Sequence, residues 1–188
     1  MEIVNKIYKF WFKIPRNIDY TTKKIIRNYI KIHFKDIIKE AECGNLLSWL
    51  NNKKSFIVFI IILDKFSTIL YSKNNLKTFE NYKKALLFLE MGLDIHLNNL
   101  TPIEKLIVLS PYKKIENLDT QKIGKDIFKN LIKLEKTPKG KNILRRGLYY
   151  QLETIKILKK FGRFPERNYV LNREFTEEEI DYLDEITK

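Results

Sequence analysis

Apolar residues recur every three or four positions along most of the chain, which is the spacing of one face of an α-helix. These stripes run over residues 3–11, 26–38, 56–70, 79–93, 123–134, 144–158 and 180–183. No stretch shows a convincing strand or β-hairpin pattern. The pattern therefore predicts an all-α protein of about seven or eight helices, forming one domain over residues 1–188. Short connections favour an antiparallel array of helix pairs similar to tetratricopeptide units, although no clean 34-residue repeat is visible.

Local chemistry predicts where several of these helices begin and end. Side chains that can cap a helix N-terminus stand at Asp19, Thr101, Asp119 and Thr176. Thr101 and Thr176 are each followed three positions later by a glutamate, so we expect a capping box at both. Gly44 suits the C-terminus of a helix, because glycine adopts the left-handed conformation readily.

The longest apolar run, Phe56 to Leu63, bears on the class of protein. Taken alone it fits a buried strand, but its continuation to Leu70 keeps the helical step. Eight residues are far fewer than the roughly 20 that cross a bilayer.

The first residues lack the features of a signal peptide. The single cysteine, Cys43, fits a reducing compartment. We expect a soluble, intracellular (cytoplasmic) protein that is not inserted in a membrane.

The chain carries a net charge of +13, and 29 of its 36 basic residues are lysine. Lys, Ile and Asn together account for 72 of 188 residues, which is typical of an AT-rich genome. The lysines are scattered through amphipathic segments, whereas specific phosphate or base recognition relies more on arginine. Residues 174–185 hold seven acids and no base. The simplest interpretation is a solvated basic surface, with salt-sensitive nucleic-acid binding as an alternative.

No strong catalytic motif is present. The chain has no phosphate loop, no dinucleotide fingerprint, no nucleophile elbow and no paired metal-binding cysteines. His33 and His96 fall in different predicted helices, so we expect no metal and no cofactor. Cys43 is expected to be a small packed residue rather than a nucleophile. The absence of these motifs favours a protein that is not an enzyme.

Polar residues gather at three places that could carry a function. They are Asp64 after the apolar run, the pair Glu116 and Gln121, and the C-terminal group Arg163, Arg167, Asn168 and Arg173. Buried arginines need carboxylate partners. One interpretation is a structural lock that holds the C-terminus on the helices. The other is a polar pocket in which Asp64 and Glu116 balance Arg163 and Arg167 and hold an anion.

These clusters, in this order, resemble the mainly bacterial family of unknown function numbered 924. The matching stretches are Phe10-Trp11-Phe12, Gly44 with Trp49, Ile61 to Phe66, Glu116-Asn117-Leu118 with Gln121, Phe161 to Asn168, Leu171 to Arg173 and Thr176 to Glu179. They extend over essentially the whole chain. The resemblance implies a tetratricopeptide-like helical fold and implies little about function.

The chain departs from the family pattern at positions that usually carry polar side chains. After Asp64 the family usually continues Gln-Phe-Pro-Arg-Asn, whereas this chain has Lys65 to Ile69. Typical histidines of the family fall on Lys114, Thr154 and Glu166. The resemblance therefore implies a divergent member in which acid–base chemistry by histidine is unavailable.

Three functions follow as hypotheses. The first is a non-enzymatic helical scaffold that binds a protein or peptide segment, as stacked helix pairs do. The second is an enzyme or binder of a small anionic ligand that uses an arginine and carboxylate pocket. The third is salt-sensitive nucleic-acid binding by the lysine-rich surface.

Overall fold

The structure, a computed structural model, describes residues 1–14, 19–71 and 75–187. Within these ranges the chain forms helices and no strand, so the predicted all-α class is confirmed. The α-helices are α1 (Glu2–Lys13), α2 (Tyr20–His33), α3 (Lys35–Glu42), α4 (Lys53–Ile61), α5 (Ser67–Tyr71), α6 (Leu76–His96), α7 (Pro102–Val108), α8 (Leu118–Leu134), α9 (Pro138–Phe161) and α10 (Glu177–Thr187). Short 3-10 turns are η1 (Leu47–Asn51), η3 (Leu97–Asn99), η4 (Tyr112–Lys114) and η5 (Pro165–Arg167), and η2 (Ile62–Phe66) is a π-helix.

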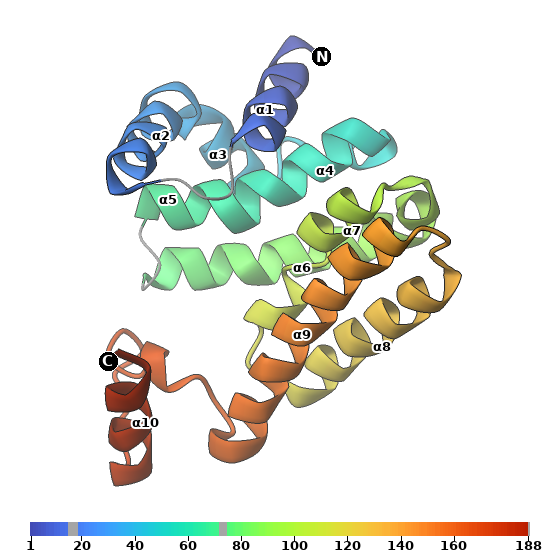
Figure 1. The fold of residues 1–188 in the computed structure, drawn as a ribbon. Coiled ribbons are helices and arrows are strands. Elements are labelled where there is room, and N and C mark those ends of the chain that lie inside the picture. Colours follow the sequence, from blue (N-terminus) through green and yellow to red (C-terminus); the bar gives the residue numbers. More distant parts are fainter. Residues whose placement is uncertain (15–18, 72–74, 188) are drawn as a thin grey trace.

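The central element is one continuous helix made of α4, η2 and α5 (Figure 1). Every side chain from Phe56 to Leu63 is 0% exposed. A helix that is apolar on all sides is stable only when other elements cover all of its faces. Here α1, α2 and α3 pack against it from one side, and α6 and α7 pack from the other. The helical interpretation of the long apolar run is therefore confirmed.

The C-terminal half extends this arrangement with an antiparallel pair, α8 and α9, which packs against α7 (Figure 1). Gly124 sets the position of η4 beside this pair. A Cβ at Gly124 would lie 2.7 Å from the Cβ of Tyr112 and 3.1 Å from Oε1 of Gln151. Because glycine has no side chain, Tyr112 packs directly against α8 and is 1% exposed. The two lysines that follow Tyr112 are thereby held against α8 and α9.

Most of the predicted helix ends are confirmed. The Asp19 side chain accepts a hydrogen bond from the Thr22 N–H at 2.8 Å. Thr101 forms its capping box with Glu104. Gly44 adopts a left-handed φ of 79°, just after the end of α3.

Two local predictions are wrong. Asp119 does not cap α8, because the preceding polar residue Asn117 accepts the Thr120 N–H at 2.8 Å. Asp119 lies instead in the first turn, where it pairs with Lys122. Cys43 is exposed rather than packed, because it follows the last residue of α3 and lies at the helix end.

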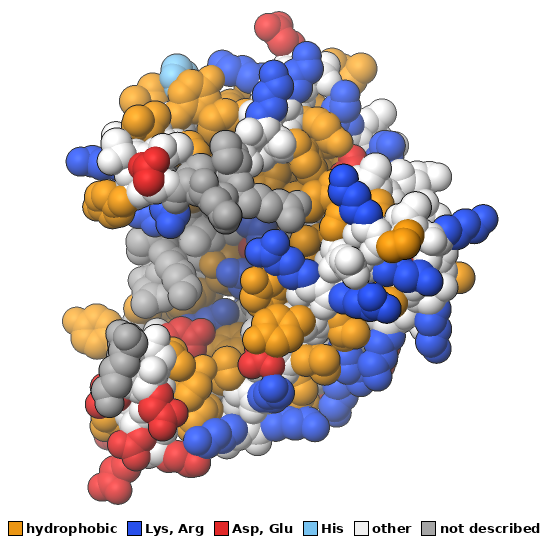
Figure 2. Space-filling model, in the orientation of Figure 1, with side chains coloured by type: hydrophobic (Ala, Val, Ile, Leu, Met, Phe, Trp, Pro, Cys, Tyr) orange, Lys and Arg blue, Asp and Glu red, His pale blue; other side chains and the backbone are white. Residues whose placement is uncertain are grey.

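Basic and acidic side chains gather in different regions of the molecule (Figure 2). Residues 118–161, which include α8 and α9, contain twelve basic and four acidic residues, a net of +8. Acidic side chains gather on the segment that contains α10. None of the helices in the described part of the chain has both the length and the apolar character that crossing a membrane requires.

Candidate functional site

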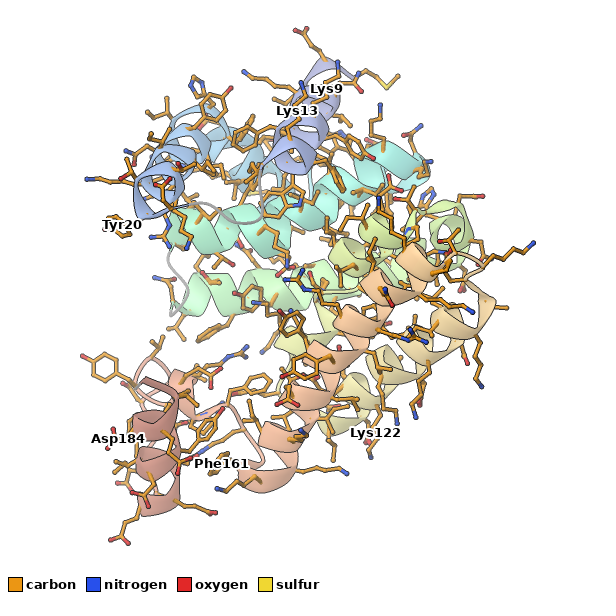
Figure 3. The ribbon with its side chains drawn as sticks, viewed as in Figure 1. Lys9, Lys13, Tyr20, Lys122, Phe161 and Asp184 are labelled. Carbon is orange, nitrogen blue, oxygen red and sulfur yellow. The ribbon has the colours of Figure 1, made fainter. Side chains whose placement is uncertain are left out.

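The C-terminal segment, residues 162–187, leaves α9 through a sharp turn. Gly162 has a left-handed φ of 72°, and its N–H donates to the Leu158 carbonyl at 2.9 Å. Phe164, which is 2% exposed, anchors the chain directly after this turn. The ring of Phe161 lies 5.1 Å from that of Tyr182, so the end of α9 also contacts α10 (Figure 3). Gly162 and the anchored Phe164 therefore shape the path by which the chain leaves α9.

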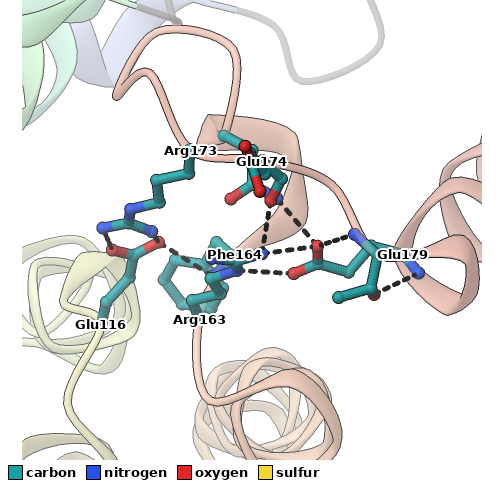
Figure 4. A network of polar contacts seen from close by, with 8 residues as sticks. Glu116, Arg163, Phe164, Arg173, Glu174 and Glu179 are labelled. Atoms are coloured by element: carbon teal, nitrogen blue, oxygen red, sulfur yellow. Dashed lines mark hydrogen bonds and ion pairs between the residues drawn. The ribbon is translucent and has the colours of Figure 1, made fainter.

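Arg163 is paired with Glu179 at the start of α10 (Figure 4). Its Nε and Nη2 donate to the two carboxylate oxygens at 2.6 and 2.7 Å, and Nη2 also donates to the Glu174 carbonyl. Glu179 is 1% exposed and accepts further hydrogen bonds from Asn168 and from the Thr176 N–H, each at 3.0 Å. The hydrogen bonds from Arg163 outweigh burial and lower the pKa of Glu179 to about 2. The capping box predicted at Thr176 is present and includes this ion pair.

Glu116 holds the same segment from the other side (Figure 4). Arg173 donates to both of its oxygens, at 3.2 and 2.8 Å, and the Phe164 N–H donates at 2.8 Å. Burial alone would raise the pKa of Glu116, but the bonds from Arg173 and Phe164 outweigh it and lower this pKa. The two ion pairs bind the C-terminal segment to itself and to the loop before α8.

Arg167 behaves differently from the other two arginines. It is 9% exposed, and its guanidinium lies 4.7 Å from the ring centre of Phe79 and 4.5 Å from that of Phe164. Its Nη2 donates to the Lys114 carbonyl at 2.8 Å. Among the described residues it makes no ion pair with a carboxylate. Burial is the largest influence on Arg167 and lowers its pKa.

Gln121 belongs to a buried amide network between α8 and α9. Its Nε2 donates to the Ile115 carbonyl at 2.9 Å. Its Oε1 accepts from Gln151 and, at 2.8 Å, from Thr154. The network fixes the register of α8 and α9 and the chain before α8.

Asp64 lies in the π-turn of the central helix and is 1% exposed. The Ser67 N–H donates to the Ile62 carbonyl five residues back, and this widened turn is the local feature that defines a π-helix. Asp64 pairs with Lys65 at 2.6 Å and accepts a hydrogen bond from Ser110. Burial alone would raise its pKa, but the charges of Lys65 and the more distant Lys114 outweigh burial and lower it.

The polar residues named from the sequence therefore form separate clusters and do not surround one polar pocket. The predicted balance of Arg163 by Asp64 or Glu116 is wrong, because Arg163 pairs with Glu179. Asp64 forms its salt bridge with its neighbour Lys65 and not with an arginine. Asn168 joins the Arg163 group, and Arg173 pairs with Glu116.

A cavity of about 240 Å³ opens between η4, η5 and α9, and Arg167 lies in its wall. Basic and aromatic side chains dominate its lining. The lining residues are Phe79, Tyr82, Lys113, Lys114, Tyr150, Glu153, Thr154, Ile157, Phe164, Glu166 and Arg167. Glu153 is paired with Lys156 on the rim at 2.7 Å. Lys114 lies over the ring of Tyr82 at 4.7 Å.

A second cavity, of about 470 Å³, adjoins the first and shares Lys113 and Tyr150 with it. Apolar side chains of α1 and α7 form much of its wall, including Trp11, Leu106 and Ile107. Sequence reasoning missed both Lys113 and Tyr150 as site residues. The only local signal was a pair of adjacent lysines next to a tyrosine, which is common in so lysine-rich a chain.

Lys113 is the most perturbed base of the site. Its Nζ lies over the Tyr150 ring at 4.9 Å, and no ion pair of Lys113 is seen in the described part of the chain. Burial, followed by the charges of Lys65 and Lys114, lowers the pKa of Lys113 to about 8. A tenth of its amines are neutral at about pH 7, on the order of a hundred-fold more than for an ordinary lysine.

Candidate metal ligands do not gather at this site. The described residues contain no group of three or more His, Cys, Asp and Glu side chains that could hold a metal ion. The chemistry offered by the two cavities is therefore that of lysine, arginine and aromatic side chains.

The sequence of this chain matches a known protein family. The model of the family described as bacterial protein of unknown function (DUF924) matches residues 7–186. The chain belongs to the DUF924 family. A solved structure of a protein of unknown function, ATU0120 from Agrobacterium tumefaciens, has a TM-score of 0.84 and 23% identity and covers 98% of each chain. This likeness confirms the fold.

A curated protein also shares part of the sequence. The alanine–tRNA ligase of Wigglesworthia glossinidia brevipalpis is 32% identical over 124 residues, which are 62% of this chain. The chain spans 13% of the length of that ligase.

Three of the departures from the DUF924 pattern lie at the first cavity. Lys114, Thr154 and Glu166, the positions at which histidine is expected from the family pattern, all line it. They come from η4, α9 and η5, and Lys114 lies 40 residues before Thr154 in the sequence. The fold therefore brings the altered positions together around Arg167, which this chain keeps from the matching stretch.

Proposed function

We propose that the protein binds a small anionic ligand, carrying a phosphate or carboxylate group, in the cavity between η4, η5 and α9. The observation that carries the proposal is the lining of one cavity by Lys113, Lys114 and Arg167. None of these three side chains forms an ion pair with a carboxylate in the described ranges. Cations that are partly buried without a counter-charge are costly, and a bound anion would offset that cost.

The shape of the site supports the same proposal. Arg167 is held in place by two rings and a carbonyl. A guanidinium held in this way loses little freedom when it binds an oxyanion. Tyr150, which is 40% exposed, offers ring surface to an aromatic or apolar part of the ligand. The two adjoining cavities together reach the size of ordinary small-molecule sites, about 300–1,000 Å³.

The test is a titration with phenyl phosphate at low salt, followed by calorimetry and by NMR shifts of η4 and η5 amides. Lys114→Met removes one cation of the cavity and is expected to weaken binding about tenfold. Lys129→Met is the matched control, because Lys129 is an exposed lysine of α8 outside both cavities. Equal binding by the two variants, or no binding at millimolar concentrations, would contradict the proposal.

Protein or peptide binding by a tetratricopeptide-like helical scaffold is a second candidate. Its support is a row of exposed apolar side chains on α6: Leu87, Met91 and Ile95 are 55%, 56% and 62% exposed. Their spacing of four residues places them on one face. Affinity capture with the wild-type chain should recover a specific protein that the Met91→Glu variant does not retain. Capture that is equal for both chains would remove this candidate.

Nucleic-acid binding is supported by the net charge of +8 on residues 118–161. A tRNA is the natural probe, since the partial relative is a tRNA ligase. Binding should fall steeply between about 50 and 200 mM salt if phosphates supply the contacts. A salt-independent interaction, or none at 50 mM salt, would argue against this candidate.

A further inference from the structure

Lys113 lies where the two cavities meet, and it lines both of them. Tyr150 is the other residue that lines both, and the Lys113 amine lies over its ring at 4.9 Å. On the side of the second cavity the wall includes Trp11, Leu106 and Ile107. The amine therefore lies between a chamber lined mainly by basic and aromatic side chains and a second chamber that combines apolar side chains with Lys23, Lys65 and Arg146.

Positive charge surrounds this amine from several elements. The largest electrostatic influences on it come from Asp64 and Lys65 on η2, Lys114 on η4 and Arg146 on α9. The linings of the two cavities add Lys23 on α2, Glu153 and Tyr150 on α9, and Glu166 and Arg167 on η5. Of the three carboxylates, Glu153 pairs with Lys156 at 2.7 Å, and Oδ2 of Asp64 is engaged by Lys65 at 2.6 Å and by Ser110. The neutral form of Lys113 is favoured by this arrangement as well as by burial.

We propose that Lys113 is a nucleophilic amine that condenses with the carbonyl group of an anionic aldehyde or ketone held in this site. This inference rests on the proposed anion site, which would hold the ligand in place. It narrows the ligand from a small anion to one that also carries an aldehyde or ketone group. An oxyanion held by Lys114 and Arg167 leaves the rest of the molecule to reach the junction of the cavities. A neutral amine at that junction has a lone pair available for attack.

The reaction is a condensation that needs no oxidant or reductant. The lone pair of Nζ attacks the carbonyl carbon, a C–N bond forms, and the π electrons of the carbonyl move to its oxygen. Nitrogen loses a proton and oxygen gains one, which gives a carbinolamine. After a second proton reaches this oxygen, it leaves as water while the nitrogen lone pair forms the C=N bond. The nitrogen then releases its remaining proton, which gives the imine. The net products are the imine and one water molecule.

Reductive trapping tests this inference on the unmodified protein. Glyoxylate, which has an aldehyde next to a carboxylate, is supplied together with cyanoborohydride, which reduces the imine to a stable secondary amine. Peptide mass spectrometry then gives the rate at each lysine. At about pH 7, Lys113 should be labelled at least about tenfold faster than the exposed Lys129, because its neutral fraction is larger. Its rate should level off above about pH 8, whereas that of Lys129 should keep rising to above about pH 10.

Two further measurements locate the reaction and separate it from anion binding. Lys113→Arg keeps the charge but has no nucleophilic amine, so the labelled mass should disappear from this peptide. Lys129→Arg should leave it in place. Labelling of Lys113 that is no faster than that of Lys129 at neutral pH would overturn the inference, even if phenyl phosphate binds. Fast labelling of Lys113 without phenyl phosphate binding would support the nucleophile and contradict the proposed anion site instead.

Discussion

The C-terminal segment and the cavity beside it contain similar cations in opposite surroundings. In the segment, Arg163 and Arg173 each meet a carboxylate with two hydrogen bonds. In the cavity, Lys113, Lys114 and Arg167 meet aromatic rings and a backbone carbonyl. Paired charges hold two parts of a chain together, whereas unpaired charges in a cavity are available to a ligand. The difference separates a structural role from a candidate binding role among residues that look alike in the sequence.

The two regions are also physically linked. Phe164 follows Arg163, donates its N–H to Glu116 and stacks on Arg167. The ion pairs of the segment therefore position the arginine of the cavity. Loss of these ion pairs should loosen the cavity, whereas changes inside the cavity should leave the segment in place.

The largest expected effect comes from breaking the pair that closes the segment. Glu179→Gln removes a carboxylate that is 1% exposed and accepts bonds from Arg163, Asn168 and a backbone N–H. We expect the free energy of unfolding at neutral pH to fall by about 2–3 kcal/mol, the scale for a hydrogen bond to a charged group. Urea denaturation measures this loss, and hydrogen exchange should locate it in residues 162–187.

Glu177→Gln is the matched control, because Glu177 lies in the same turn of α10 and is exposed. Its effect should stay within about 0.5 kcal/mol. If Glu179→Gln and Glu177→Gln lower the free energy of unfolding equally, the total charge of α10 stabilises the segment and the ion pair between Arg163 and Glu179 does not.

Acid should act on the same segment with a smaller effect. The folded pKa of Glu179 is about 2 and that of Glu116 is also lowered, so both lie below their unfolded values. Their stabilisation is present above the unfolded pKa and is lost as the pH falls from about 4.5 toward 2. The protection factors for hydrogen exchange of residues 173–179, which correct for the intrinsic pH dependence of exchange, should fall over this range. Most of this pH dependence should disappear in the Glu179→Gln variant. If the pH dependence persists in that variant, groups other than Glu179 cause it.

Removing the Lys113 charge from the cavity should raise the free energy of unfolding rather than lower it. The folded pKa of Lys113, about 8, lies below its unfolded value, so its charged form opposes folding at lower pH. Lys113→Met should therefore stabilise the protein by about 1 kcal/mol at pH 7, after allowance for solvent screening. The gain should shrink as the pH rises from about 8 to 10.5, because the wild-type amine then becomes neutral. A lower free energy of unfolding for Lys113→Met at pH 7 would mean that favourable contacts hold Lys113. The contrast between paired charges in the segment and unpaired charges in the cavity would then fail.

The sequence was sufficient for the helices because periodicity and caps are local signals. The run from Phe56 to Leu63 and the caps at Asp19, Thr101 and Thr176 needed only neighbours within a few residues. Asn117 replaced Asp119 as a cap because the first helical turn starts two residues earlier than the pattern suggested.

Pairing of charges could not be predicted in the same way. Arg163 and Arg173 could each meet several acids, and only the path of the chain after Gly162 brings Glu179 to one and Glu116 to the other. Lys113 looked like one of 29 lysines. Its surroundings come from η2 and α9, and distances between such elements are set by packing.

The smallest expected effect concerns Glu166, the acid that lines the cavity from η5. Its charge opposes an incoming anion, so Glu166→Gln should tighten phenyl phosphate binding about two- to threefold, which corresponds to roughly 0.5 kcal/mol. Calorimetry at low salt can resolve this change, and about 0.5 M salt should reduce it by screening. Glu177→Gln removes an equal charge outside the cavity lining and should change affinity less. Weaker binding in Glu166→Gln would mean that this carboxylate positions the ligand or Arg167, and the cavity would then depend on paired charges as the segment does.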